Sequence, residues 1–253
     1  MQAEFLGVGE ACDESLANTS VLVRTEGDSA GVVLLDCGFT VFPRLFSSLP
    51  DPESLDAVWI SHFHGDHIFG LPLVLLRMWV SGRKKPLLIA GQGGIQDRVE
   101  EILDLAYPGL RKKMDFDLQF LELEPGSREL ILDITWSTAQ TGHSHRNLAL
   151  RLESGQSCLY YSGDGPPSAE SEDLAKGCKT LIHEAYTTGQ QIPGHATVSQ
   201  CLDLARRTGA RNLALVHLQR EERRNRREEA QQELAEPKDI QAWIAKQGEV
   251  VRV

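Results

Sequence analysis

The sequence has no long apolar run, no pair of cysteines at metal-binding spacing and no excess of positive charge. Its longest apolar stretch, from Ile68 to Val80, is interrupted by Arg77 and is too short to cross a bilayer. The N-terminus, Met1-Gln2-Ala3-Glu4, lacks the basic segment of a secretory signal. We therefore expect a soluble, cytoplasmic protein without membrane partners.

The five cysteines are scattered and odd in number, and no two of them have C-x-x-C spacing. This pattern argues against a disulfide framework and against a zinc ion held by thiolates. We expect reduced thiols that pack as small apolar side chains. They are Cys12, Cys37, Cys158, Cys178 and Cys201.

Positive charge is scarce, because 26 Lys and Arg face 36 Asp and Glu, which leaves a formal net charge of −10. Wrapping of duplex nucleic acid through basic faces is therefore disfavoured. Arginines do cluster between Arg220 and Arg227, but the same segment contains glutamates, including the i,i+4 pairs Glu222/Arg226 and Arg224/Glu228. We expect most of this charge to cancel on a solvated helix, while one or two arginines remain able to reach a substrate phosphate.

The chain does contain an alternation of short apolar strands and amphipathic helices. Val32 to Leu35 and Ala57 to Ile60 are typical of buried strands, and the apolar stripe that begins at Ile95 predicts a helix ending before Pro108. No repeat or linker divides the sequence, so we expect one domain over residues 1–253. Two similar halves of this kind favour an α/β (α+β) fold with two packed sheets covered by helices on the outside.

Four further segments complete this prediction. Ile68 to Val80 is expected to be one helix, and Leu130 to Trp136 is expected to be one strand. Val198 to Arg207 is expected to be a helix capped by Thr197. The last segment of the chain is expected to be helical and exposed.

Eight histidines carry most of the chemical information. Three of them form the string His62-x-His64-x-Asp66-His67 after the strand that ends at Ile60. Imidazole and carboxylate are ligands for zinc-like ions, and a tight turn can direct two of these side chains at one ion and two at a second. Gly65 allows that turn without a side-chain clash. The string therefore predicts a metal site at the end of a strand.

Together with motifs elsewhere, this string resembles the metallo-β-lactamase superfamily and, within it, the ribonuclease Z-like branch. The resemblance implies the αββα sandwich, in which two packed mixed sheets have helices outside. It covers nearly the whole chain through seven ordered matches. They are Asp36-Cys37-Gly38, Ser61 to His67, His143, Tyr161-Ser162-Gly163-Asp164, His183-Glu184-Ala185, Gly194-His195-Ala196-Thr197 and Val216-His217-Leu218.

The resemblance also implies ligands for two divalent metal ions. Zinc suits neutral imidazoles and carboxylates, with manganese or iron as alternatives. One ion would be held by His62, His64 and His143. The other would be held by Asp66, His67 and His217, with Asp164 as the bridge between the two.

The expected mechanism follows from charge. Two divalent ions exceed the combined charge of Asp66, Asp164 and a bridging hydroxide, so the site keeps a positive balance that suits a phosphodiester anion. The hydroxide would be the nucleophile, and Asp66 is placed to accept the proton of the attacking water. The resemblance nominates His195, positioned or charged by Glu184, as the general acid for the leaving alkoxide.

Three neighbouring residues are expected to play supporting parts. Asp36 would orient a ligand or its loop. His183 would be structural. His145 has no counterpart in the family pattern and would be exposed or lie at the rim of the pocket.

The chain departs from the ribonuclease Z-like pattern in several places. Gly165 stands where the family usually has threonine, and Ala196 stands where it usually has serine, so the pocket wall is altered. More importantly, only 21 positions separate His143 from Asp164. Ribonuclease Z enzymes that process tRNA commonly place a long substrate-gripping arm there. The short connection predicts weak or no binding of folded tRNA.

The sequence therefore favours a dinuclear phosphodiesterase that acts on a small or single-stranded phosphodiester, and related enzymes suggest a homodimer. One alternative keeps the metal site but hydrolyses a carboxylic ester, lactone, lactam or sulfate ester, since the fold does not choose among these chemistries. A non-catalytic scaffold is a further alternative. It is disfavoured because all seven ligand positions are filled.

Overall fold

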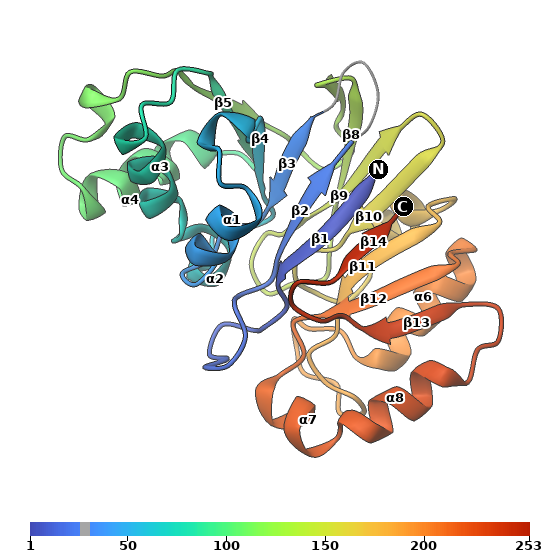
Figure 1. Cartoon of the computed structure of the whole chain (residues 1–253). Coiled ribbons are helices and arrows are strands. Elements are labelled where there is room, and N and C mark those ends of the chain that lie inside the picture. Colours follow the sequence, from blue (N-terminus) through green and yellow to red (C-terminus); the bar gives the residue numbers. More distant parts are fainter. Residues whose placement is uncertain (26–30) are drawn as a thin grey trace.

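The computed structural model describes residues 1–25 and 31–253, which form four layers with two mixed seven-stranded sheets in the middle (Figure 1). The first sheet contains, in spatial order, β14 (Val250–Arg252), β1 (Gln2–Gly7), β2 (Ser20–Arg24), β3 (Val32–Leu35), β4 (Ala57–Ile60), β5 (Leu87–Gly91) and β6 (Leu118–Glu122). The second contains β13 (Gln241–Ile244), β12 (Asn212–Val216), β11 (Thr180–Glu184), β10 (Ser157–Tyr161), β9 (Leu148–Ser154), β8 (Ile134–Gln140) and β7 (Arg128–Ile131).

Helices cover the outer faces of both sheets (Figure 1). The first sheet carries α1 (Phe42–Ser48), α2 (Gly65–Ile68), α3 (Leu71–Val80) and α4 (Ile95–Ala106). The second carries α5 (Ala169–Ala175), α6 (Val198–Thr208), α7 (Arg220–Asn225) and α8 (Arg227–Ala235). Short 3-10 turns lie at Pro52–Ser54 and Arg111–Lys113. This arrangement confirms the predicted αββα sandwich.

Three apolar cores correspond to the three contacts between layers, and strand alternation explains them. Leu35 and Trp59 belong to the core between the two sheets, whereas Leu34 and Val58 belong to the core beneath α1, α3 and α4. Successive side chains of a strand point to opposite faces, so both faces of the first sheet are buried. Trp59 meets Trp136 of the second sheet edge to face, with ring centroids 6.1 Å apart.

The predicted single strand from Leu130 to Trp136 was wrong, because this segment is the hairpin of β7 and β8. The turn residues Leu132 and Asp133 both have positive φ, 54° and 56°. Hairpin turns of this kind favour Asn and Gly at these positions. The sequence therefore carries no turn signal here.

Two other boundaries also differ from the prediction. The expected helix from Ile68 to Val80 is divided into α2 and α3, with Gly70 and Pro72 at the junction. The last segment is helical only as far as Ala235, and it continues as the edge strands β13 and β14.

Among residues 1–25 and 31–253, no helix has both the length and the apolar character needed to span a membrane.

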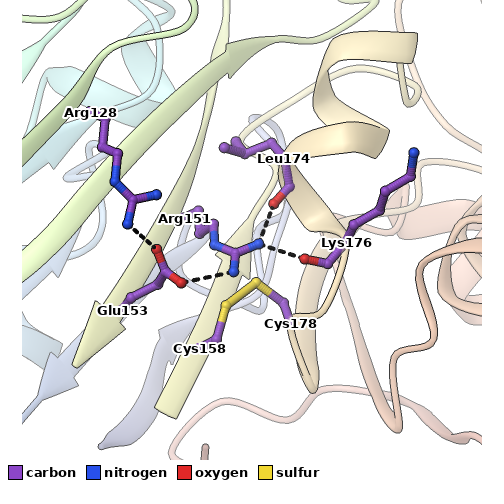
Figure 2. The surroundings of a disulfide bond; sticks show 7 residues. All are labelled: Arg128, Arg151, Glu153, Cys158, Leu174, Lys176 and Cys178. Carbon is purple, nitrogen blue, oxygen red and sulfur yellow. Dashed lines mark hydrogen bonds and ion pairs between the residues drawn. A yellow bond between two sulfur atoms is a disulfide. The ribbon is translucent and has the colours of Figure 1, made fainter. Parts of the chain in front are cut away.

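The prediction of five reduced cysteines was wrong for one pair, since Cys158 and Cys178 form a disulfide (Figure 2). They are 20 positions apart in sequence. However, β10 and β11 run parallel and pair directly, so residues near the start of each strand become neighbours. Sequence spacing does not reveal such a strand register. Cys12, Cys37 and Cys201 are free.

A polar cross-link lies beside the disulfide (Figure 2). Arg151 of β9 donates through Nη1 to the carbonyl oxygens of Leu174 and Lys176, at 2.9 and 2.6 Å, at the end of α5. Its Nη2 donates to Glu153 at 2.8 Å. Carbonyl groups at a helix C-terminus lack partners within the helix and favour a nearby cation. Arg151 and the disulfide therefore both fasten the end of α5 to the second sheet.

Candidate metal centre

The seven predicted ligands converge at one edge of the two sheets, because they follow the ends of strands. β4 leads into His62, β10 leads into Asp164, and β12 ends directly before His217. His143 lies in the connection from β8 to β9. The carboxyl ends of parallel strands meet at the same edge of a sheet, so loops that are distant in sequence come together there.

The first group of residues consists of His62, His64, His143 and Asp164, whose potential ligand atoms all lie within 4.8 Å of one another. His62 Nε2 is 3.0 Å from His64 Nδ1, and His143 Nε2 is 3.4 Å from the same nitrogen. Three ring nitrogens therefore point into one small volume. Such a cluster is the donor set of a zinc-like ion.

The second group consists of Asp66, His67 and His217, with ligand atoms that meet the same 4.8 Å limit. Asp66 Oδ2 is 3.3 Å from the Nε2 atoms of both histidines. All three side chains are buried.

Asp164 stands between the two groups. Its Oδ2 lies 3.9 Å from His62 Nε2. Its Oδ1 lies 3.4 Å from His67 Nε2 and 3.7 Å from His217 Nε2. One carboxylate oxygen thus faces each group, which is the arrangement that a bridging ligand requires.

The residues present fit divalent cations, as their unpartnered atoms indicate. His67 Nε2 and Asp164 Oδ1 are buried and have no hydrogen-bond partner within the described part of the chain. Leaving a buried polar atom unpaired costs about 1–3 kcal/mol. A cation between these two atoms would satisfy both.

Burial favours the neutral form of two imidazoles of the first group, those of His62 and His64. It lowers the pKa of His62 well below the usual value for histidine, and the nearby His67 adds to this effect. Burial also lowers the pKa of His64, with further contributions from His143 and His145. A neutral imidazole has a lone pair free for a cation, so His62 and His64 can bind metal without losing protons.

In the second group, neighbouring carboxylates raise the pKa values of the histidines and favour their protonated forms. Burial alone would lower the pKa of His67, but Asp164 and Asp36 raise it well above its usual value. Burial also opposes the charge on His217, yet Asp164 and the hydrogen bond to Asp66 raise its pKa to about 9. In the metal-free protein, protons on these imidazoles balance the carboxylates. A metal ion must displace them.

The outward ring nitrogens of His62 and His143 have partners of their own. His62 Nδ1 is 3.1 Å from Ser61 Oγ. His143 Nδ1 is 2.7 Å from the carbonyl oxygen of Gly194. Contacts of this kind fix the orientation and tautomer of a metal-binding imidazole.

Asp36 holds three neighbours at once and lies where an orienting carboxylate was expected. Its Oδ2 is 2.8 Å from His67 Nδ1 and accepts hydrogen bonds from Ser61 Oγ at 2.8 Å and Tyr161 Oη at 2.6 Å. Its Oδ1 accepts from the backbone N–H of Ser61 at 2.8 Å. This buried network joins the ends of β3, β4 and β10 behind His67.

The predicted acid–base pair lies next to the metal-binding groups. His195 Nδ1 is 3.2 Å from Glu184 Oε1, and the Glu184 side chain is fully buried. The same oxygen accepts from the backbone N–H groups of Gly165 and Ala196, both at 2.9 Å. One ring nitrogen of His195 also lies within 4.8 Å of ligand atoms of Asp164 and His217.

Tyr186, which directly follows the His183-Glu184-Ala185 motif, was not among the predicted site residues. Its ring stacks on His195 with centroids 4.4 Å apart, and His195 in turn stacks on His217 at 5.9 Å. No sequence motif marked this tyrosine. The three stacked rings fix the plane of His195 beside the second group.

His183 and His145 lie outside both groups. His183 is buried, and its Nδ1 is 2.7 Å from the carbonyl oxygen of Glu184, as expected of a structural residue. His145 is exposed, as expected, but its ring contacts His64. It lines a cavity of about 490 Å³, and Phe63 and Phe69 also line this cavity.

The departure at Gly165 has a steric explanation. Its φ is 104°, in a region that side-chain-bearing residues rarely adopt. A Cβ atom there would lie 2.5 Å from the backbone nitrogen of His143. Glycine at this position therefore lets the His143 loop approach Asp164 closely.

The arginines that follow His217 pair mainly with the loop after β1. Arg220 Nη1 is 3.0 Å from Glu10 Oε1, and Arg223 forms an ion pair with Asp13. Both carboxylates are buried. Charge cancellation was predicted correctly, but for Arg220 and Arg223 it occurs with a distant segment and not along one solvated helix.

The two ion pairs expected within this segment have different outcomes. Arg226 Nη1 lies 3.6 Å from Glu222 Oε1, so the first pair is present. Arg224 instead contacts Glu14 of the loop after β1.

Comparison with known proteins gives the family and the fold. The Anti-Pycsar protein Apyc1 family matches residues 1–240. The chain is 32% identical to ribonuclease Z of Limosilactobacillus fermentum, over 86% of this chain and 87% of that one. The human tRNase Z short form, ELAC1, has a TM-score of 0.80 at 22% identity, covering 100% of this chain and 99% of that one. The metallo-beta-lactamase fold protein YhfI from Bacillus subtilis has a TM-score of 0.79 at 24% identity, covering 99% and 98%.

The similarity in sequence extends over the whole site, and the similarity in structure covers all four layers. With the clustered His and Asp side chains, it identifies a metal-dependent hydrolase of the metallo-β-lactamase fold that is ribonuclease Z-like. The chain belongs to the Anti-Pycsar Apyc1 family.

Proposed function

We propose that this chain is a dinuclear phosphodiesterase that hydrolyses small or single-stranded phosphodiesters. The observation that carries the proposal is the position of Asp164, whose two carboxylate oxygens face different histidine groups. An ion held by one histidine group would have only the nearer of these oxygens beside it, whereas an ion in each group would give both oxygens a role.

Each ion would have its own ligands, and zinc suits the donor set, with manganese or iron as alternatives. When bound, the ions would lower the pKa of an attacking water and neutralise charge that builds up on the phosphoryl oxygens. The first ion would take His62, His64 and His143. The second would take Asp66, His67 and His217, with Asp164 shared.

The chain's own residues would move the protons. Asp66 would accept the proton of the attacking water, because only its Oδ2 lies against the imidazoles of the second group and the other carboxylate oxygen is left for the water. His195 donates a proton to the leaving oxygen. Glu184 lies against its Nδ1, so the other ring nitrogen remains available to the substrate.

The preference for a small substrate is supported by the connection between His143 and Asp164. Strands β9 and β10 pair antiparallel and occupy most of this connection. The nearby Arg220 and Arg223 are engaged by acidic side chains. A folded RNA is bound through many basic contacts to its backbone. We therefore expect weak, strongly salt-sensitive binding of precursor tRNA.

The tRNA prediction is tested by a processing assay on precursor tRNA beside a small phosphodiester, under identical metal and salt conditions. We expect turnover of the small substrate and little removal of the 3′ trailer. Efficient trailer cleavage at physiological salt would overturn the substrate assignment.

The phosphodiester preference is tested by comparing a bis-aryl phosphate with an aryl carboxylic ester, a lactone, a lactam and an aryl sulfate. We expect the phosphate diester to have the highest kcat/KM. Faster turnover of any other substrate would assign the metal site to that ester class. Asp164→Asn should lose the phosphodiester turnover, whereas Asp173→Asn, the same change at an exposed carboxylate on α5, should keep it.

The assembly and location are also proposed. We infer a homodimer, for which light scattering should report twice the mass of one chain. We infer one domain over residues 1–253, supported by the core that the two sheets share. Cooperative unfolding in a single transition would agree with this. A cytoplasmic location stays a prediction for cell fractionation to test.

A further inference from the structure

His64 differs from the other metal-binding histidines in how its outward ring nitrogen is held. Its Nδ1 faces the first group, 3.0 Å from His62 Nε2 and 3.4 Å from His143 Nε2. Its Nε2 therefore points away from the centre. That nitrogen lies 3.2 Å from Nδ1 of His145, and the two ring centroids are 4.7 Å apart.

The outward partners of the neighbouring histidines are of a different kind. Ser61, which contacts His62, is fully buried, and so is Asp36, which contacts His67. By contrast, His64 is half-buried and its partner His145 is exposed, on the connection between β8 and β9. Packing alone therefore constrains the His64 ring less than it constrains the fully buried rings.

We propose that His145 is a positioning residue for His64, an inference that rests on the proposed metal-dependent function. When Nδ1 of His64 carries the lone pair for the first ion, the ring proton resides on Nε2. Nε2–H then donates to Nδ1 of His145. This hydrogen bond selects both the tautomer and the rotamer of His64 that present Nδ1 to the ion.

Loss of this hydrogen bond affects one ion and not the other. Without His145, the half-buried ring of His64 can rotate and can place its proton on Nδ1, which removes the lone pair from the centre. Loss of an outer partner typically costs 10–100-fold in metal affinity. We expect about a tenfold loss for the first ion, because the bond is exposed, and no change for the ion held by Asp66, His67 and His217.

His145 also lines the cavity of about 490 Å³ next to His64, together with Phe63, Phe69 and Arg146. A residue that touched the substrate there would act on KM without affecting the metal. The proposal therefore requires a measurement that separates metal affinity from substrate affinity.

The test is a titration of the metal-free protein with Zn²⁺ against a competing chelator, and with Co²⁺ monitored by its visible spectrum. His145→Ala should bind one of two ions about tenfold more weakly and should alter the Co²⁺ spectrum of that ion. In His145→Asn the side-chain oxygen can accept the hydrogen bond from His64 Nε2–H, so this variant should recover most of the affinity for the first ion. Arg146→Ala, an exposed change in the same cavity, should bind both ions like the wild type.

Two results would overturn the positioning role. One is a His145→Ala variant that binds both ions with wild-type affinity but has a raised KM, which makes His145 a substrate contact. The other is an equal loss of both ions. Failure of the proposed function has a separate result, since a wild-type chain that binds no second ion, or two ions without phosphodiester turnover, contradicts the dinuclear phosphodiesterase whatever His145 does.

Discussion

The two halves of the proposed metal centre contain similar side chains in different surroundings. In the first half, His64 and His143 are half-buried, and burial and neighbouring imidazoles keep the ring of His64 neutral. In the second half, His67 and His217 are buried against carboxylates that raise their pKa values. The ring of His64 in the first half is therefore neutral and can accept a metal ion directly. The rings of His67 and His217 in the second half are protonated and must first lose a proton. The surroundings, and not the ligand type, determine how each half takes up an ion.

The largest effect is expected where the halves share a ligand. Asp164→Ala removes the carboxylate that faces both groups and leaves two cations opposite each other without a bridge. We expect activity to fall by more than the 10–100-fold typical of losing an outer partner, together with loss of at least one ion. Elemental analysis measures the ions, and kcat/KM measures the activity.

His64→Ala should also abolish activity, but this variant should retain the second ion. Loss of both ions from it would contradict the proposal that the two halves bind their ions separately.

The next largest effect is expected from His195, the proposed general acid, which lies beside the second half. His195 stacks on His217 of the second group and contacts Glu184. His195→Ala should lower kcat by about 10²-fold or more for a poor alkoxide leaving group and hardly affect an activated aryl leaving group that needs no proton. Equal losses on both substrates would leave His195 as a positioning residue.

The pH dependence of metal affinity should separate the halves directly. The pKa of His217 is about 9, so at neutral pH an ion entering the second half must displace a proton. Its affinity should rise about tenfold per pH unit between pH 7 and 9 for each proton displaced. Affinity of the first half should be nearly constant over this range, because the pKa values of His62 and His64 are lowered. Two equally steep profiles would remove the distinction.

A smaller effect is expected on the stability of the metal-free protein. The folded-state pKa of His217 lies above the ordinary value of histidine, so its contribution is complete below about pH 6.5 and is lost as the pH rises through about 9. The loss should be roughly 3 kcal/mol or less. Denaturant unfolding of the metal-free chain between pH 6 and 9 measures it. The zinc-loaded protein is the control and should not follow this trend.

The clustering of these His and Asp side chains was predictable because they lie in short motifs at strand ends, and the family resemblance proposed which of them share an ion. The alternation of apolar side chains also sufficed to predict two sheets with helices outside. Contacts that depend on tertiary register were not predictable. Cys158 meets Cys178 because β10 and β11 pair in parallel, and Arg223 meets Asp13 across 210 positions. Tyr186 stacks on His195 without any spacing that announces it.

The ion pairs between the loop after β1 and α7 have a consequence for how the protein is made. The backbone N–H of His217 donates to the carbonyl oxygen of Val8, and β1 pairs with β14 at the other end of the chain (Figure 1). On the ribosome, Glu10 and Asp13 emerge long before Arg220 and Arg223 can neutralise them. The second group is therefore complete only after His217 has been synthesised, and a chain that stops before this residue lacks one of the three side chains of that group.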